Sequence, residues 1–125
     1  MKNFMKIQKI CFDIDGVVCL TKEKDYKYSK PIKKNIKKIN QLYDAGYKII
    51  LYTARYMGRS SNDEKKATKL AKKITLFQLK KWKVKYHFIK FGKPSYDLLV
   101  DDKSLFFKKN WNKNIQNVIK KSYGK

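Results

Sequence analysis

The sequence predicts one α/β domain of the Rossmann-like type, with a central, mainly parallel sheet between two layers of helices. Apolar segments typical of strands alternate with segments of helical period, and this alternation favours a parallel sheet covered on both faces. The 125 residues are enough for one packed core but not for two. The 42% hydrophobic content is well above that of a disordered chain of this charge. We therefore expect a single three-layer α/β/α domain over residues 1–125.

Four apolar runs are predicted to be the strands of the sheet. The first three, residues 7–12, 47–52 and 86–91, are long enough for buried strands, and residues 98–100 form a shorter run, Leu-Leu-Val. The polar stretch 21–30 between the first strand and the next helix is predicted to be a loop.

Three segments have the signals of helices. The first begins near Pro31, a residue suited to the first turn, and ends at the capping glycine Gly46. The second opens with Ser61–Glu64, which fits a capping box, and its apolar positions continue to Trp82. A final helix is predicted around Ile115–Ile119.

The net charge of +22 raises the question of an anionic partner. The cations are 30 lysines and only two arginines, and arginine supplies most of the bidentate contacts of specific nucleic-acid recognition. The lysines are also spread over every segment. We therefore favour a solvated surface over a nucleic-acid site, while a basic nucleic-acid-binding module stays open as the alternative.

The cysteines and the hydrophobic segments indicate the compartment. Cys11 and Cys19 form neither a C-x-x-C pair nor a disulfide framework. No apolar run approaches the length of a membrane span, and the N-terminal segment lacks the pattern of a signal peptide. We expect a cytoplasmic protein with no membrane partner.

Polar side chains follow each of the four predicted strands, at the point where the strand ends. In a parallel sheet these carboxyl ends meet at one edge, where ligands bind. The sequence therefore predicts one shared site. Its members are Asp13, Asp15, Thr53, Lys93, Asp101 and Asp102.

The chemistry of this set indicates phosphoryl transfer. Four clustered carboxylates cannot all stay ionised without a cation, and a set of oxygen ligands without cysteine or histidine favours Mg²⁺. A threonine hydroxyl and nearby backbone N–H groups can hold phosphate oxygens, and a lysine stabilises the charge of the nucleophile and of the transferred group.

Four motifs resemble those of the haloacid dehalogenase superfamily of phosphohydrolases. They are Phe12–Val18 (FDIDGVV), Leu51–Arg55 (LYTAR), Lys93–Pro94 and Val100–Asp102 (VDD), in this order along the chain. The resemblance covers about residues 7–103. Each motif is weak alone, but four in order at predicted strand ends are a specific signal.

The resemblance implies a catalytic role for four residues. Asp13 would be the nucleophile that forms an aspartyl-phosphate, and Asp15 would act as general acid and then as general base. Thr53 would bind the phosphoryl group, and Lys93 would link it to Asp13 electrostatically. An aspartate at position 15 is the form expected of phosphatases.

The resemblance also implies a magnesium site. Mg²⁺ would be held by the side chain of Asp13, the main-chain carbonyl of Asp15 and the side chain of Asp101. Asp102 would contribute directly or through a metal-bound water.

Substrate specificity is where the resemblance implies least. The intervals 15–53 and 53–93 have room for a loop and one helix each, so there is no cap domain, and the open site suits a bulky substrate or cover by a neighbouring subunit. A homo-oligomer is therefore plausible. The short length and residues 51–60 most resemble small phosphatases encoded with capsule and surface-polysaccharide biosynthesis, which implies a sugar phosphate as substrate. A phosphatase of nucleotides or nucleic-acid ends is a further alternative.

The segment after Thr53 supplies the predicted substrate ligands. Ala54 offers a backbone N–H group, and Arg55 and Arg59 are the only two arginines of the chain. Arginine suits a second phosphate or a carboxylate of the substrate, with surface ion pairing as the equal alternative.

Overall fold

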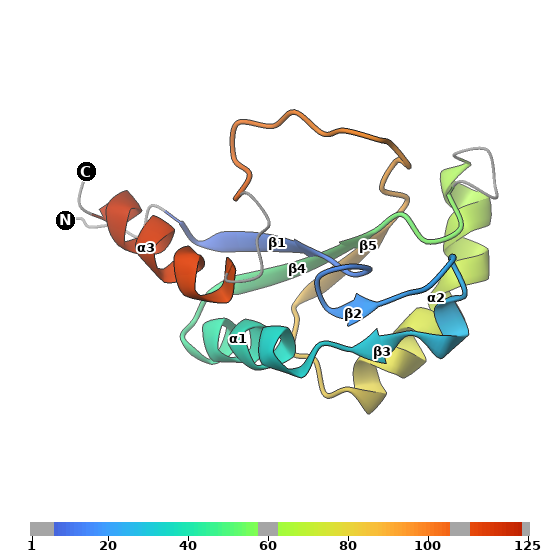
Figure 1. Ribbon diagram of the computed structural model, residues 1–125, viewed down its shortest axis with the longest axis horizontal. Helices are drawn as coiled ribbons and strands as arrows, with labels where there is room; N and C mark the ends of the chain where they lie inside the picture. The colour runs from blue at the N-terminus through green and yellow to red at the C-terminus, as the bar shows by residue number, and fades with distance from the viewer. Residues whose placement is uncertain (1–6, 58–62, 106–110, 124–125) are drawn as a thin grey trace.

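The computed structural model describes residues 7–57, 63–105 and 111–123 and has a Rossmann-like α/β fold (Figure 1). Three parallel strands and three α-helices make up most of the domain. No helix among the described residues is long and apolar enough to cross a membrane. The elements in chain order are β1 (Lys9–Asp13), β2 (Cys19–Leu20), the 3-10 helix η1 (Tyr26–Tyr28), β3 (Lys30–Pro31), α1 (Lys33–Asp44), β4 (Lys48–Thr53), α2 (Glu64–Lys81), β5 (Phe88–Phe91) and α3 (Trp111–Tyr123).

The main sheet has the strand order β1-β4-β5, and both neighbouring pairs are parallel. Phe12 of β1 lies opposite Leu51 of β4, and Leu51 lies opposite Ile89 of β5. The three strands therefore point the same way, and their carboxyl ends lie at the same edge. This confirms the predicted strands 7–12, 47–52 and 86–91 to within two residues.

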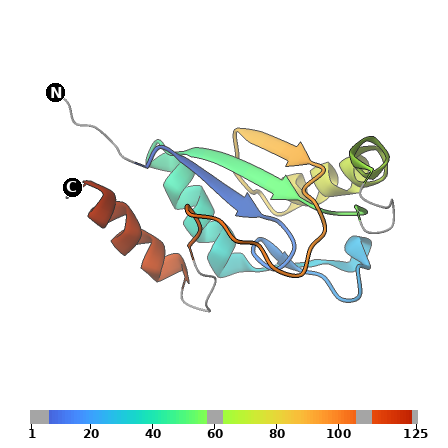
Figure 2. The ribbon, with the colours of Figure 1, turned by 90° about the horizontal axis from the view of Figure 1, so that it is seen from above.

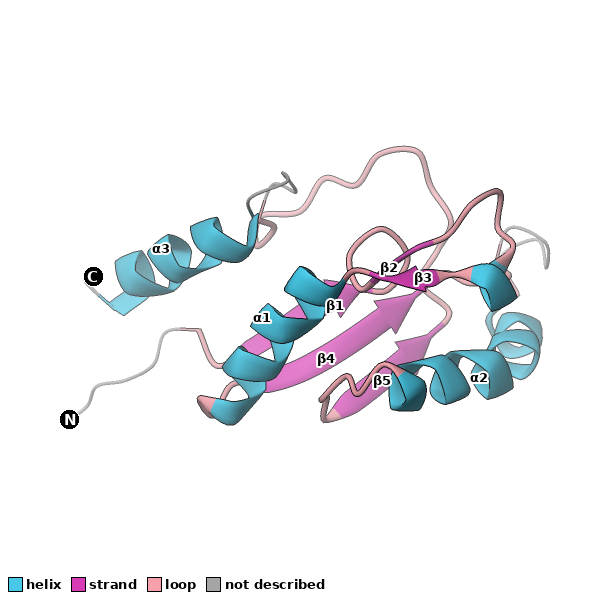
Figure 3. Cartoon of the chain, turned by 60° about the horizontal axis from the view of Figure 1, so that its bottom comes forward, coloured by secondary structure: helices cyan, strands magenta, loops and turns pink. Residues whose placement is uncertain are grey.

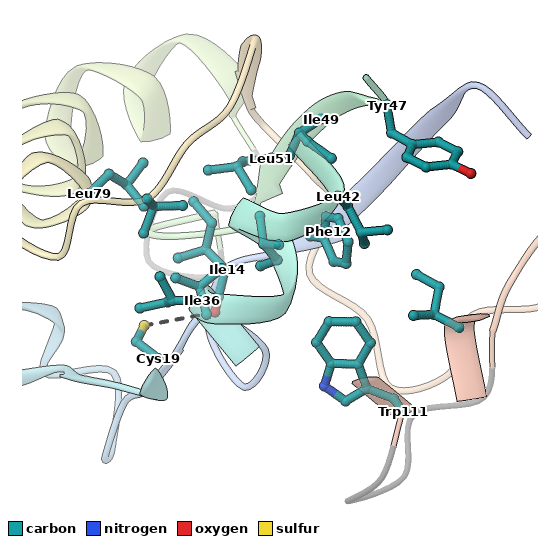
Figure 4. Packing of buried hydrophobic residues seen from close by; sticks show 14 of the residues in the cluster. Phe12, Ile14, Cys19, Ile36, Leu42, Tyr47, Ile49, Leu51, Leu79 and Trp111 are labelled. Atoms are coloured by element: carbon teal, nitrogen blue, oxygen red, sulfur yellow. Dashed lines mark hydrogen bonds between the residues drawn. The ribbon is translucent and has the colours of Figure 1, made fainter. Parts of the chain in front are cut away.

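The helices gather on one face of this sheet. A right-handed crossover connects β1 to β4, and another connects β4 to β5, so α1 and α2 lie on the same side of the sheet. In Figure 2, seen from above, the strands lie in front of α1. In Figure 3, where the bottom of the molecule comes forward, α1 lies in front of the strands. α3 packs beside α1 through Trp111, whose ring centroid lies 5.5 Å from that of Phe12. The hydrophobic core therefore lies between the sheet and these helices, as Figure 4 shows for side chains such as Ile49 and Leu51.

The opposite face of the sheet has no helix over it among the described residues. Successive side chains of a strand point to opposite faces, so Cys11, Ile50 and Tyr52 lie on this second face while their neighbours are in the core. Phe88 lies on the same face and is 59% exposed. The described residues thus form two layers, where the sequence analysis expected three.

A small hairpin flanks the predicted loop 21–30. β2 and β3 pair antiparallel, with Cys19 opposite Pro31 and Leu20 opposite Lys30. The stretch between them contains η1. Two-residue strands have too few positions to show a periodic pattern, which explains why the sequence did not predict them.

The predicted strand over residues 98–100 is wrong in this structure. The segment has no regular secondary structure, and Leu98 and Val100 are 81% and 90% exposed. Figure 1 shows this part of the chain arching above the sheet, on the side away from α1. A buried strand needs a neighbour, and β1 is paired only with β4.

The helix ends differ slightly from the predicted ones. α1 begins at Lys33, so Pro31 lies in β3 and not in the first turn of the helix as predicted. The helix ends before Gly46, whose φ of 100° is the left-handed conformation that glycine adopts without strain. α2 begins at Glu64, where the side chain of Asp63 accepts a hydrogen bond from the N–H of Lys66. The aspartate therefore caps the helix, and Ser61 of the predicted capping box lies outside the described residues.

Candidate functional site

A cavity of about 300 Å³ opens at the carboxyl ends of β1 and β5. Its walls come from the turn after β1, the loop before η1, the turn after β4 and the segment after β5. The lining residues are Asp13, Asp15, Thr21, Lys24, Tyr26, Ala54, Arg55, Lys93, Pro94, Ser95 and Tyr96.

Asp13 and Lys93 face each other across this cavity. The Lys93 ammonium lies 3.4 Å from Oδ2 of Asp13. Oδ1 of Asp13 accepts a hydrogen bond from the N–H of Ile14 at 3.0 Å. The N–H of Lys93 donates to the carbonyl of Thr53 at 3.0 Å, which fixes the chain as it leaves β5. The structure thus brings together these two predicted site residues, 80 positions apart in the sequence.

The electrostatics of the pair reflect their partial burial. Desolvation raises the pKa of the Asp13 carboxyl above its ordinary value, and the opposing effect of Lys93, which is 3.4 Å away, does not cancel it. Desolvation lowers the pKa of Lys93, but a hydrogen bond with Tyr96 and the charge of Asp13 outweigh it, so the pKa is raised overall. A charged lysine therefore faces a carboxyl group whose ionised form would be stabilised by any further positive charge.

Asp15 lies on a tight turn that follows β1. Gly16 has a φ of 93° and nothing within 4 Å of where a Cβ would stand, so glycine here serves the backbone conformation and not a close contact. Its N–H donates to the carbonyl of Cys19 at 2.7 Å. The turn directs the Asp15 carboxylate to Arg55, whose Nη2 lies 3.0 Å from Oδ1.

Thr53 is the last residue of β4 and Ala54 follows it beside the cavity, but their side chains lie differently. Thr53 is 1% exposed, does not line the cavity, and its Oγ1 accepts a hydrogen bond from the N–H of Arg55 at 3.0 Å. The Thr53 hydroxyl therefore points into the protein and stabilises the turn, whereas the sequence predicted that it would bind the phosphoryl group. Ala54 does line the cavity, as predicted for a substrate contact.

Of the two predicted substrate arginines, the structure describes Arg55. It lines the cavity, but it is 1% exposed and each of its side-chain nitrogens donates to a protein group, so the structure favours neither a direct substrate contact nor the alternative of a surface ion pair. Arg59 lies outside the described residues.

Asp101 and Asp102 are not brought to the cavity. Both are exposed, and Oδ1 of Asp101 accepts a hydrogen bond from the N–H of Lys103 at 2.9 Å. Within residues 7–57, 63–105 and 111–123, no three histidine, cysteine, aspartate or glutamate side chains gather closely enough to hold a metal ion. The predicted magnesium ligands are therefore split between Asp13 and Asp15 on one side and these two residues on the other.

Several residues of the site carried no sequence signal. Tyr96 interacts with Lys93, whose ammonium lies 5.2 Å from the ring centroid. Thr21 comes from a stretch predicted only as a loop, and it donates to Oδ1 of Asp15 at 2.6 Å. For Tyr26 the sequence leaves open a ring that stacks on a sugar or one that anchors the loop to the core, and its burial agrees with the favoured anchoring role. The nearness of Tyr96 to the Lys93–Pro94 motif was the one clue available.

Comparison with known proteins supports the fold. No family model matches the chain, and no curated protein matches it. A solved crystal structure of a structural-genomics target from Vibrio cholerae is similar, with a TM-score of 0.79 and 23% sequence identity over 92% of this chain and 98% of that one. Its title names no activity. At this identity the likeness extends to the fold alone, which is a Rossmann-like α/β fold.

Proposed function

We propose that the chain is a phosphomonoester hydrolase, a capless phosphatase of the haloacid dehalogenase type that works through an aspartyl-phosphate. The observation that carries this proposal is the placement of Asp13 opposite Lys93, with Asp15 two residues further on, around one cavity at the carboxyl ends of parallel strands. Such strand ends are where α/β proteins bind ligands.

The geometry supports a two-step reaction. In the first step an oxygen of Asp13 attacks the phosphorus, the bond to the leaving oxygen breaks, and Asp15 gives a proton to that oxygen. In the second step water attacks the aspartyl-phosphate, Asp15 takes the proton of the water, and inorganic phosphate leaves as Asp13 is regenerated. Lys93, 3.4 Å from Asp13, stabilises the negative charge on the transferred group.

The predicted Mg²⁺ does not fit the described arrangement of residues. Of the predicted ligands, the side chain of Asp13 and the main-chain carbonyl of Asp15 belong to residues that line the cavity. Asp101 and Asp102 lie on an exposed segment. The proposed reaction therefore uses only side chains of the chain, and the magnesium requirement stays a prediction that a chelator tests directly.

For the substrate we propose a small sugar phosphate, as in the synthesis of a capsule or surface polysaccharide. A cavity of about 300 Å³ is at the lower end of the range for small-molecule sites. The ring of Tyr96, which is 44% exposed, can pack against a sugar, and Lys24 and Lys93 add positive charge for the phosphate. The same features admit a nucleotide, which a substrate panel separates.

The test is phosphate release from an aryl phosphate, with and without Mg²⁺ and after addition of EDTA. We expect turnover by the parent protein and none by Asp13→Asn. Asp44→Asn is the matched control, because Asp44 is an exposed acid at the end of α1 whose ion pair with Lys85 is remote from the cavity. Equal rates for all three proteins would contradict the proposal. Sugar phosphates, nucleotides and phosphorylated oligonucleotides then identify the substrate class.

A second candidate function, nucleic-acid binding, is favoured by one observation. A groove of about 470 Å³ lies between α1 and α3, and no acidic side chain lines it. Its lining residues are Lys34, Lys37, Lys38, Gln41, Asn112, Lys113 and Gln116. Such a set suits the phosphates of a nucleic-acid backbone.

Binding of a DNA duplex and of a single-stranded RNA at two salt concentrations tests this candidate. We expect a strong salt dependence if the groove binds phosphates. Replacing Lys34, Lys37 and Lys38 together by glutamine should weaken binding more than the same change at Lys69, Lys72 and Lys73 of α2, which alters the net charge equally. No binding at low salt, or equal losses for the two triple variants, would exclude the groove.

A further inference from the structure

Arg55 is a buried arginine at the wall of the candidate site. It follows β4 in a tight turn, closed by a hydrogen bond of 2.9 Å from the N–H of Met57 to the carbonyl of Ala54. Its side chain has no exposed area, although an unpaired guanidinium is among the most costly groups to bury. The local structure must therefore satisfy it completely.

The guanidinium is bonded on every nitrogen. Nε donates to both carboxylate oxygens of Asp15, at 3.2 and 3.0 Å, and Nη2 donates to Oδ1 at 3.0 Å. Nη1 donates to Gln78 Oε1 at 2.6 Å and to Thr75 Oγ1 at 3.1 Å, both on α2. The ring of Tyr26 lies 4.9 Å from Cζ. A substrate phosphate could reach these donors only by displacing Asp15.

A second path leads from Arg55 to the same carboxylate oxygen. Nη2 of Arg55 also donates to Ser29 Oγ at 3.3 Å, and Ser29 lies 2.6 Å from Thr21 Oγ1. Thr21 donates its single hydroxyl hydrogen to Oδ1 of Asp15 at 2.6 Å. Ser29 must then be the donor to Thr21. The hydroxyl chain and the direct bonds from the guanidinium converge on Oδ1.

The two oxygens of Asp15 are consequently unequal. Oδ1 accepts from Nε, Nη2 and Thr21, with the Cys19 thiol at 3.5 Å, whereas among the described contacts Oδ2 accepts only from Nε. A carboxylate oxygen accepts about two hydrogen bonds. Oδ1 is therefore saturated, and Oδ2 keeps a lone pair for a ligand in the cavity.

We propose that Arg55 is a positioning residue that fixes Asp15 with Oδ2 as the oxygen that exchanges a proton with the substrate. This inference rests on the proposed phosphatase function. In the first step Oδ2 carries the proton and delivers it to the ester oxygen as the phosphorus–oxygen bond breaks. In the second step the same oxygen takes a proton from the attacking water. Arg55 itself contacts neither substrate nor phosphorus.

The dependence of the rate on the leaving group tests this role. Phenolates with electron-withdrawing groups leave without a proton, whereas an alkoxide needs one. The two substrates are p-nitrophenyl phosphate and glycerol 2-phosphate. The variant is Arg55→Lys, which keeps the positive charge but cannot make the bidentate contact with the Asp15 carboxylate. We expect kcat/KM, which reports the step that expels the leaving group, to fall by roughly 100-fold for glycerol 2-phosphate and by less than about 5-fold for p-nitrophenyl phosphate; kcat falls for both esters where hydrolysis of the aspartyl-phosphate limits the rate.

Two further variants separate positioning from a purely structural role. Thr75→Val removes one partner of Nη1 at a side chain that is fully buried and cannot touch substrate. We expect a smaller loss of rate that again affects mainly the alkyl ester. If Arg55→Lys does not fold, Thr75→Val tests the proposal in its place. Ile39→Val destabilises the core away from the cavity and should leave both rates unchanged.

The outcomes are distinct. Equal losses of kcat/KM on both substrates in both Arg55→Lys and Thr75→Val, or a raised KM with kcat unchanged for both esters, would overturn the positioning role while leaving the phosphatase intact. If the parent protein hydrolyses neither ester, the proposed function fails and the role of Arg55 fails with it.

Discussion

Asp13 illustrates how a site residue can reduce the stability of the fold that holds it. Its carboxyl is partly buried at the end of β1, and desolvation outweighs the attraction of Lys93, so its pKa is raised in the folded state. A protein that only had to be stable would place a neutral side chain here. The raised pKa supports a functional reason for the acid.

The sign of this effect gives a testable pH dependence. For an acid whose pKa is raised on folding, the unfolded chain loses the proton first, so stability falls as the pH rises from the ordinary carboxyl value of 3.8 through the raised one. Asp13→Asn should therefore raise the Tm at pH 7, and the gain should shrink as the pH approaches 4. Thermal melts at several pH values measure it. A Tm lowered at pH 7, with Asp44→Asn unchanged, would contradict the assigned direction.

At the scale of the elements, the periodic segments were predictable and the pairing of short ones was not. The strands 47–52 and 86–91 and the first helix have apolar patterns that depend only on their own sequence, and the structure confirms them within two residues. Leu98–Val100 has the composition of a strand, but three residues form one only when a neighbour binds them. Such pairing is a tertiary event that local composition does not contain.

The candidate site follows the same division. Asp13, Asp15, Ala54 and Lys93 could be found because each lies at the end of a strand or within two residues after it, and the parallel sheet brings strand ends together. The inward turn of Thr53 and the burial of Arg55 depend on side-chain bonds with residues on other elements, among them Gln78 of α2. No pattern within the LYTAR motif distinguishes a buried arginine from an exposed one.

The start of α2 offers a test at the same scale. The Asp63 side chain accepts from the N–H of Lys66 at 3.1 Å, so Asp63→Ala should lower the free energy of unfolding by about 1 kcal/mol. Asp25→Ala is the matched control, because Asp25 precedes η1 without a capping hydrogen bond from its side chain. Urea denaturation measures both. Equal effects of the two substitutions would show that the cap contributes nothing specific.

For the whole molecule, the dominant feature is a net charge of +22 on 125 residues. Three ion pairs join described residues, those of Arg55 with Asp15, Lys85 with Asp44 and Lys93 with Asp13. Most lysines thus lie among like charges, which oppose a compact state. The same repulsion opposes the association of copies of the chain.

Salt should therefore stabilise the fold. Exposed charges are screened within about 8 Å at physiological ionic strength, so repulsion among the lysines weakens as salt is added. We expect the Tm to rise between 10 mM and 500 mM sodium chloride, measured by circular dichroism at constant pH. A falling Tm would mean that the three ion pairs outweigh the repulsion.

The open face of the sheet has one more consequence, which concerns the thiol of Cys11. This side chain is exposed and stands two residues before Asp13 on the same face of β1, whereas Cys19 is buried and burial raises its pKa to about 11. Desolvation raises the pKa of Cys11 as well, and the charge of Lys93 partly offsets that rise. A bound phosphate would neutralise Lys93 and remove the offset.

Cys11 can therefore report on occupancy of the cavity without any engineered label. Alkylation by iodoacetamide should modify this thiol alone in the native protein, and inorganic phosphate should slow the reaction. Cys11→Ser should leave no reactive thiol until denaturant exposes Cys19. An alkylation rate that does not change with saturating phosphate would mean that the anion does not bind in the cavity. The unprotected side of the sheet thus gives chemists a direct, enzyme-independent readout of ligand binding.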